Sequence, residues 1–246
     1  MELLNFSIFT LFAIFVFMNI FYLLSLKFKR KDIADIAWGL GFLVVSIFNL
    51  TLSKDYQQTK IILTFLIFLW SLRLSIYIYL RNKDKREDFR YKSFKNSYFS
   101  VFIFQGFLMF LVSLPITLYN RFDGGVWFYG FIGLLVWITG FYFETVGDLE
   151  MYFFKKDLKN KGKILKDGLW KYTRHPNYFG EVTMWWGIWI LTIGSTYWYL
   201  GLIGPLTITY LILKVSGIPL LEKKYKGNVE FEKYKKVTPI FFPKFW

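Results

Sequence analysis

Long apolar runs alternate with short polar connections along the whole chain. A helix needs about 20 mainly apolar residues to cross about 30 Å of hydrocarbon, and repeated runs of this length are typical of membrane-spanning helices. The pattern therefore predicts an all-α fold, a polytopic membrane helix bundle with seven transmembrane helices. The predicted spans are residues 3–26, 33–53, 60–80, 98–119, 126–147, 178–194 and 196–214.

The two ends of the chain fit the same picture. The first run is too long for the core of a signal peptide and no small-residue cleavage pattern follows it, so we expect it to be a span. Residues 215–246 are rich in lysine and aromatic residues and are predicted to form a tail that does not cross the membrane. We predict a single integral membrane domain over residues 1–246.

Basic residues are distributed unevenly among the connections. Of the 31 Lys and Arg residues, 27 lie after the first, third, fifth and seventh predicted spans, and the connection 81–95 is one of these basic segments. The positive-inside rule then places the N-terminus outside and the tail in the cytoplasm. Topology and contact with anionic membrane lipids account for most of the net charge of +14, so we expect lipids rather than nucleic acid as partners.

Composition removes several classes of chemistry. The chain has no Cys, which excludes disulfides, thiolate catalysis and Cys-ligated zinc. It has one His, His175, which gives little support to a His-based metal site or a Ser-His-Asp relay, and we predict no metal. The 55% hydrophobic content and the Lys- and Phe-rich composition are compatible with a bacterial inner membrane, which is the predicted location.

Ionisable residues inside the predicted spans form a second pattern. Such residues are costly in a bilayer and usually face a partner or a water-filled cavity. They all fall in the cytoplasmic half of the spans, so we favour a polar cavity open to the cytoplasm over separate structural ion pairs, such as Arg73 with Glu144 or Asp35. The set comprises Asp35, Arg73, Glu144, Asp148 and Glu181, with Gln105 as a neutral member.

Ionisable and hydrogen-bonding side chains are concentrated in residues 144–187. Pro176 suits the first turn of a helix, where its missing N–H costs nothing. Arg174 and His175 would then lie beside a helix N-terminus, which favours an anion such as a phosphate. A basic juxtamembrane loop is the simpler alternative, but it would less readily combine Asn, Tyr, Glu and the only His.

The segment also carries a family resemblance. N-K-G-K at 160–163, G-L-W-K-Y-T-R-H-P-N-Y-F-G-E at 168–181 and W-W-G at 185–187 resemble the steroid 5-alpha-reductase superfamily, in its bacterial branch of DUF1295-type multi-pass proteins. The resemblance extends through G-D at 147–148, R-N at 81–82, E-D-x-R-Y at 87–91, Q-G at 105–106 and S-G-I-P-L-L-E-K-K at 216–224. R-H-P-x-Y-x-G is also similar to isoprenylcysteine carboxyl methyltransferases and related phospholipid methyltransferases.

The resemblance implies an NADPH-dependent oxidoreductase acting on CH–CH groups. It would take NADPH from the cytoplasm and reduce a double bond conjugated to a carbonyl, in a lipophilic substrate entering from the bilayer, as a 3-oxo-5-alpha-steroid 4-dehydrogenase does. In that family a Glu and a Tyr from the second and third helices polarise the ketone. This chain has Asp35 in the second helix and Trp70 at the Tyr position, with Tyr77 nearby.

The resemblance and the residue pattern together give the candidate site. Asp35 and Tyr77 are the candidate catalytic residues, and Trp38, Trp70 and Gln105 are candidates for substrate binding. Arg86 and Lys155 are further phosphate candidates. The candidate cofactor-binding residues are Arg73, Arg81, Asn82, Arg90, Glu144, Asp148, Arg174, His175, Asn177, Tyr178, Glu181, Glu222, Lys224 and Tyr234.

Two other classes of function stay open. One is an S-adenosylmethionine-dependent isoprenylcysteine or phospholipid methyltransferase, and the other is a transporter or lipid-binding scaffold without catalysis. For the reductase, steroid, polyprenyl and fatty acyl enones all remain candidate substrates.

Overall fold

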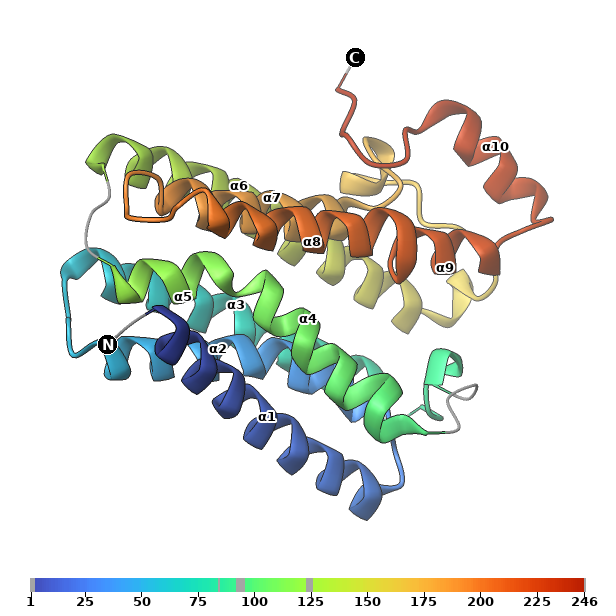
Figure 1. Cartoon of the computed structure of the whole chain (residues 1–246). Coiled ribbons are helices and arrows are strands. Elements are labelled where there is room, and N and C mark those ends of the chain that lie inside the picture. Colours follow the sequence, from blue (N-terminus) through green and yellow to red (C-terminus); the bar gives the residue numbers. More distant parts are fainter. Residues whose placement is uncertain (1–2, 84, 92–95, 123–125, 246) are drawn as a thin grey trace. The chain divides into compact units, whose positions relative to one another are not determined.

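All regular structure in the described part of the chain is helical, which confirms the predicted all-α class. The computed structural model describes residues 3–83, 85–91, 96–122 and 126–245, so Lys92 and Lys95 of the basic connection lie outside the described residues. The helices (Figure 1) are α1 (Leu3–Phe28), α2 (Ile33–Ser53), α3 (Gln58–Asn82), α4 (Phe104–Val112), α5 (Leu114–Arg121), α6 (Trp127–Lys156), α7 (Pro176–Leu191), α8 (Ile203–Tyr210), α9 (Ile218–Lys224) and α10 (Val229–Val237).

Several helices are long and apolar enough to cross a membrane, as expected for a multi-pass protein. Within the described ranges five segments qualify, namely α1, α2, α3, α6 and Leu200–Lys224, and the bent pair Tyr98–Val112 and Leu114–Arg121 makes a sixth. The sequence predicts seven. The difference lies at α7, whose 16 residues extend only about 24 Å, less than the hydrocarbon thickness.

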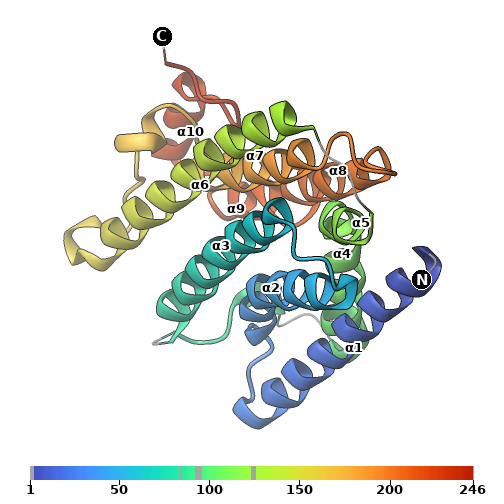
Figure 2. The same cartoon turned by 90° about the vertical axis from the view of Figure 1, so that its left-hand side faces the viewer.

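The chain groups into two compact units, which are described separately. Unit 1 comprises Met1–Gly130 and Thr192–Gly204, and unit 2 comprises Phe131–Leu191 and Pro205–Trp246. In unit 1, α2 packs against both α1 and α3, and Figure 2 shows it between them. The interior is aromatic: Phe42 packs edge-on against Trp70 at 5.5 Å and against Trp38 at 5.0 Å between ring centroids.

The predicted span 98–119 is broken rather than straight. Tyr98–Ile103 is a π-helix that leads into α4, and the following helix α5 is bent from that segment by 53°. Pro115 lies in the first turn of α5, where its missing N–H leaves the helical hydrogen-bond ladder incomplete. Proline therefore gives the physical reason for the bend.

Unit 2 is built on a backbone contact between α6 and α7. A Cβ added at Gly140 would lie 2.4 Å from the Met184 nitrogen, and one added at Gly180 would lie 2.3 Å from the Glu144 nitrogen. Gly133 and Gly187 meet the partner backbone in the same way. The seven-residue spacing from 133 to 140 and from 180 to 187 puts these glycines on one stripe of each helix, and small residues let membrane helices approach closely.

The last part of unit 2 is a helical tail. Asn228 caps α10 by accepting a hydrogen bond from the Phe231 N–H at 3.0 Å. Phe231 and Tyr234 point inward from α10 and are buried, whereas Val229 and Val237 at its two ends are exposed. The tail is thus folded onto unit 2 along one face of α10.

Candidate functional site

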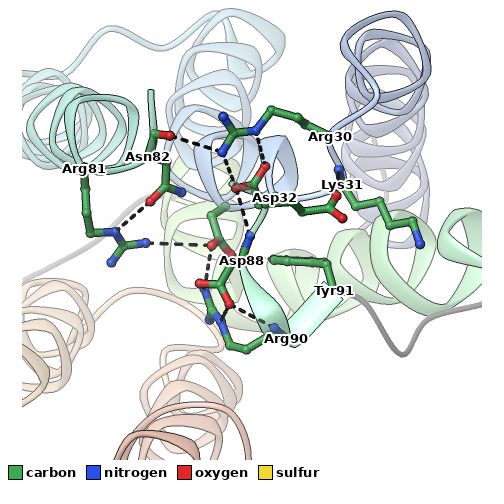
Figure 3. Close-up of polar contacts among 10 residues, drawn as sticks. Arg30, Lys31, Asp32, Arg81, Asn82, Asp88, Arg90 and Tyr91 are labelled. Carbon is green, nitrogen blue, oxygen red and sulfur yellow. Dashed lines mark hydrogen bonds and ion pairs between the residues drawn. The ribbon is translucent and has the colours of Figure 1, made fainter. Parts of the chain in front are cut away.

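In unit 1, candidate site residues gather at the start of α2 (Figure 3). The carboxylate of Asp35 accepts a hydrogen bond from the Arg90 guanidinium at 2.7 Å and from the Tyr91 hydroxyl at 2.6 Å. Arg81 lies 3.9 Å from the same carboxylate and donates to the Asn82 side chain at 3.1 Å. The structure therefore brings together four of the predicted residues and adds Tyr91, which the sequence reasoning missed.

A second layer of ion pairs fastens the connection between α3 and α4 to α2. Asp88 accepts two bonds from the Arg90 guanidinium, at 3.0 and 3.1 Å, and one from the Arg90 N–H at 3.0 Å, and its own N–H donates to the Asp32 carboxylate at 3.4 Å. Asp32 pairs with Arg30 at 2.7 Å. Burial acts to raise the pKa of Asp88, but the hydrogen bonds and charge of Arg90 outweigh it and hold that pKa below its ordinary value.

The ion pairing within this cluster argues against a phosphate site. Arg90 is half-buried among acids, and the charge of Asp35 and the hydrogen bond and charge of Asp88 outweigh burial and hold its pKa above the ordinary value. Each guanidinium group here already pairs with a carboxylate, so a phosphate would have to displace those acids. The carboxylates are Asp32, Asp35, Glu87 and Asp88, and the guanidinium groups are Arg30, Arg81 and Arg90.

The remaining candidates of unit 1 lie deeper or along α3. Trp70 is fully buried and Trp38 is half-buried, both against Phe42. Gln105 donates a hydrogen bond to the Ala34 carbonyl at 3.2 Å, one residue from Asp35. On α3, Arg73 and Tyr77 are half-buried, and the Tyr77 ring lies under the Arg81 guanidinium at 5.6 Å.

In unit 2, the site is organised by the start of α7 at Pro176, as the sequence predicts. Arg174 precedes it and is buried, with its guanidinium 2.9 Å from the Glu222 carboxylate of α9. The same guanidinium donates to the carbonyls of Lys235 and Thr238 at 3.2 Å each. Arg174 is therefore engaged by protein acceptors, and its geometry suits tying the tail to α7 better than binding a phosphate.

His175 shares the Glu222 carboxylate with Arg174. Its Nε2 lies 3.2 Å from Glu222, and its ring stacks on Tyr178 at 5.9 Å between centroids. Burial lowers the pKa of His175, and the Glu222 carboxylate only partly offsets that effect. Its side chain is 5% exposed, and the described residues supply no hydrogen-bond partner for its buried Nδ1.

Asn177 links the first turn of α7 to α6. Its amide nitrogen donates to the Asp148 carboxylate at 3.1 Å, and a Cβ added at Gly147 would lie 3.1 Å from the Asn177 nitrogen. The Asn177 side-chain oxygen is buried and unpaired. Glu144 is buried one turn before Asp148 on α6, and Glu181 is half-buried one turn after Asn177 on α7. The surroundings of this helix start are rich in hydrogen-bond acceptors.

A third set of contacts holds the loop before α7. The Tyr234 hydroxyl donates to the Trp170 carbonyl, and the Trp170 indole donates to the Gly147 carbonyl at 3.2 Å. Burial raises the pKa of Tyr234, so the hydroxyl stays a donor. Tyr234 thus holds the loop before α7 through Trp170. The candidate Lys224 is exposed on α9. Sequence reasoning missed Trp170, although it lies within the G-L-W-K-Y-T-R-H-P-N segment.

These features are those of a helical integral membrane protein with a buried polar site where α7 begins. Residues 21–238 match the family described as "Protein of unknown function (DUF1295)". The match covers most of the chain, so the protein belongs to the DUF1295 family. No curated protein matches the chain. No solved structure matches it either.

Proposed function

We propose that this protein is a membrane-embedded, NADPH-dependent reductase of a conjugated carbon–carbon double bond in a lipophilic substrate. The observation that carries the proposal is the pair of buried, unpaired polar atoms at the start of α7, His175 Nδ1 and the Asn177 side-chain oxygen. They lie within R-H-P-N-Y-F-G-E, the segment whose sequence resembles the steroid 5-alpha-reductase superfamily. The described residues supply neither atom with a hydrogen-bond partner, and a bound cofactor that pairs with both would account for them.

The residues around α7 fit one part of the cofactor. Acceptors on Asp148 and Asn177 suit groups that donate hydrogen bonds, such as ribose hydroxyls and the nicotinamide carboxamide. Glu144 and Glu181 add carboxylates on the same two helices. Phosphates would repel these acids, so we assign them to basic side chains away from the helix start, with exposed Lys224 as one candidate.

The proposed chemistry needs a hydride from the cofactor and a hydrogen-bond donor from the chain. NADPH would supply the hydride that reaches the carbon beta to the carbonyl. Charge would then develop on the carbonyl oxygen, which needs a hydrogen-bond donor, and a proton from solvent would be added at the alpha carbon to complete the reduction. Tyr77 is the proposed donor, because both oxygens of Asp35 already accept hydrogen bonds, from Arg90 and Tyr91. Asp35 is then proposed to hold the α3–α4 connection in place.

The proposal includes a topology. We propose seven crossings of a bacterial inner membrane, with the N-terminus outside and the tail in the cytoplasm. Support for the additional crossing comes from α7, which runs antiparallel to α6 from beside Gly147 to beside Gly133. An α7 shorter than the hydrocarbon would be accommodated by local thinning of the bilayer.

The test is cofactor binding by the full-length protein in detergent or nanodiscs. NADPH is expected to raise the melting temperature of the protein. Asn177→Ala and Glu181→Ala are each expected to raise the apparent Kd for NADPH, obtained from this shift, at least tenfold. Both variants should still melt cooperatively without NADPH. Glu232→Ala is the matched control, because Glu232 is exposed on α10 and its side chain is 50% accessible. It should leave the NADPH shift unchanged.

The same measurement decides between the candidate classes. A shift with S-adenosylmethionine and none with NADPH would replace the reductase with a methyltransferase, whose family also carries R-H-P-x-Y-x-G. No shift with either cofactor would leave a transporter or lipid-binding scaffold and overturn the proposal. NADPH consumption with steroid, polyprenyl or fatty acyl enones would then identify the substrate class.

A further inference from the structure

The last residues of the tail form a strap across the loop that precedes α7. We define the C-terminal strap as residues 238–245, which follow α10 and lead to the C-terminus marked in Figure 1. The Pro239 carbonyl accepts from the Arg174 N–H at 2.9 Å, and the Phe241 carbonyl accepts from the Thr173 hydroxyl at 2.8 Å. The Lys244 N–H donates to the Tyr172 carbonyl at 2.9 Å. The strap is thus fixed by its backbone.

Fixing the backbone leaves several strap side chains facing outward. Phe241 is buried against Phe179, with ring centroids 5.7 Å apart. In contrast, Phe242 is 74% exposed and Phe245 is 62% exposed, and Ile240 between the two buried strap positions is also exposed. Large apolar side chains held in the open by an ordered backbone mark an interaction surface.

Charge identifies the surface that this face would meet. Residues 233–245 contain four lysines and no acidic residue, and Lys236 and Lys244 are exposed beside the apolar side chains. The acids of α10 lie at its other end, where Glu230 pairs with Lys166 at 2.6 Å. A segment that combines exposed aromatic side chains with lysines binds the interface of an anionic bilayer.

The position of the strap along the helices agrees with that partner. From Trp127 to Gly147, α6 extends about 30 Å, which is the thickness of the hydrocarbon. Gly147 lies beside Asn177, and the strap holds residues 172–174 immediately before that point. If residues 127–147 of α6 cross the hydrocarbon, the strap lies at the depth where headgroups meet acyl chains, the level that aromatic side chains prefer.

We propose that the C-terminal strap docks on the anionic lipid surface of the bilayer that holds the protein. Phe242 and Phe245 enter the boundary between headgroups and acyl chains, and Lys236 and Lys244 contact anionic headgroups. Because Arg174 is bonded to the same segment, this contact also stabilises the loop before α7. The inference does not depend on the proposed reductase activity.

The chain has no Cys, so a single introduced cysteine gives one labelling site. A spin label at Phe242→Cys, in the full-length protein in nanodiscs, is expected to be more accessible to oxygen than to a water-soluble nickel chelate. Phe245→Cys should give the same result, and Val229→Cys should not. Val229 is the matched control, because it is 70% exposed at the opposite end of α10.

Lipid charge supplies the second arm. In nanodiscs of neutral phosphatidylcholine alone the label at Phe242→Cys should lie closer to water than in nanodiscs containing phosphatidylglycerol. Adding Lys236→Gln and Lys244→Gln should remove most of that difference, at about fivefold per lysine in the docked population. A label that stays accessible to the nickel chelate in both lipids would overturn the proposal. So would a label shielded from both reagents, which would indicate a protein partner.

Discussion

Gly140→Ala tests whether direct backbone contact holds α6 and α7 together. The added Cβ would lie 2.4 Å from the Met184 nitrogen and 2.6 Å from the Gly180 oxygen, whereas ordinary contact begins at 3.4 Å. The helices must therefore separate by about 1 Å locally, which forfeits about a quarter to a half of the dispersion energy at each neighbouring contact. Overpacking of this kind costs about 1–3 kcal/mol.

Helix propensity acts in the opposite direction and needs a control. Alanine is favoured over glycine by about 1 kcal/mol in a helix interior, and this gain partly hides the clash. Gly130→Ala on the same helix carries the gain alone, because no atom of the described residues outside its own helix turn lies within 4 Å of a Cβ added there. The difference between the two variants therefore isolates the cost of separating the helices, expected to be about 2 kcal/mol.

Thermal unfolding of the full-length protein in a mild detergent provides the assay. For a chain of this size the difference corresponds to a melting temperature about 4–8 °C lower for Gly140→Ala than for Gly130→Ala. Gly180→Ala, which places a Cβ 2.3 Å from the Glu144 nitrogen, should behave like Gly140→Ala. Equal melting temperatures for Gly140→Ala and Gly130→Ala would refute the reasoning.

Three further variants probe the contacts around α7. Glu222→Gln should destabilise the protein by about 2 kcal/mol in a thermal melt, because it removes the charge that pairs with Arg174. The cost is below the ~3–5 kcal/mol of fully buried pairs because the Glu222 side chain is 17% exposed. An unchanged melting temperature would contradict this prediction. Since burial lowers the pKa of folded His175 below its ordinary value of 6.5, stability should fall as pH drops below 6.5, by up to about 1.4 kcal/mol per pH unit, and His175→Gln should flatten this part of the pH profile. Tyr234→Phe should cost about 1 kcal/mol in denaturant titration, through loss of the bond to the Trp170 carbonyl, and a cost near zero would show that water replaces it.

Apolar run length predicted most of the helices well. The span 33–53 coincides with α2, and the positions of the first, third and fifth runs match α1, α3 and α6. Run length could not show that Pro115 would break the fourth run, because a proline near a helix start can be either harmless or a bend. Nor did it show the glycine contacts, although the seven-residue spacing was present in the sequence.

The site was predictable where its chemistry is local. Proline at the first position of α7 follows from backbone geometry, so the helix start at Pro176 was foreseen. The partners of Arg174 were not, because Glu222 and the carbonyl of Thr238 are brought to it by the fold of the tail. An arginine in a basic segment indicates an anion site by composition, and only tertiary structure reveals acceptors that already engage it.

The glycine contact between α6 and α7 also limits how unit 2 can move. Two helices that touch through backbone cannot turn about their own axes, because rotation would bring a side chain where only a hydrogen atom fits. They can slide or tilt only as a pair, so Asn177 and Asp148 keep the same distance and orientation relative to each other. Any opening of this site must then come from the parts without such a contact, which are α9, α10 and the C-terminal strap. In mechanical terms, α6 and α7 form a rigid frame, and the tail is attached to it through the hydrogen bonds of Thr173 and Arg174.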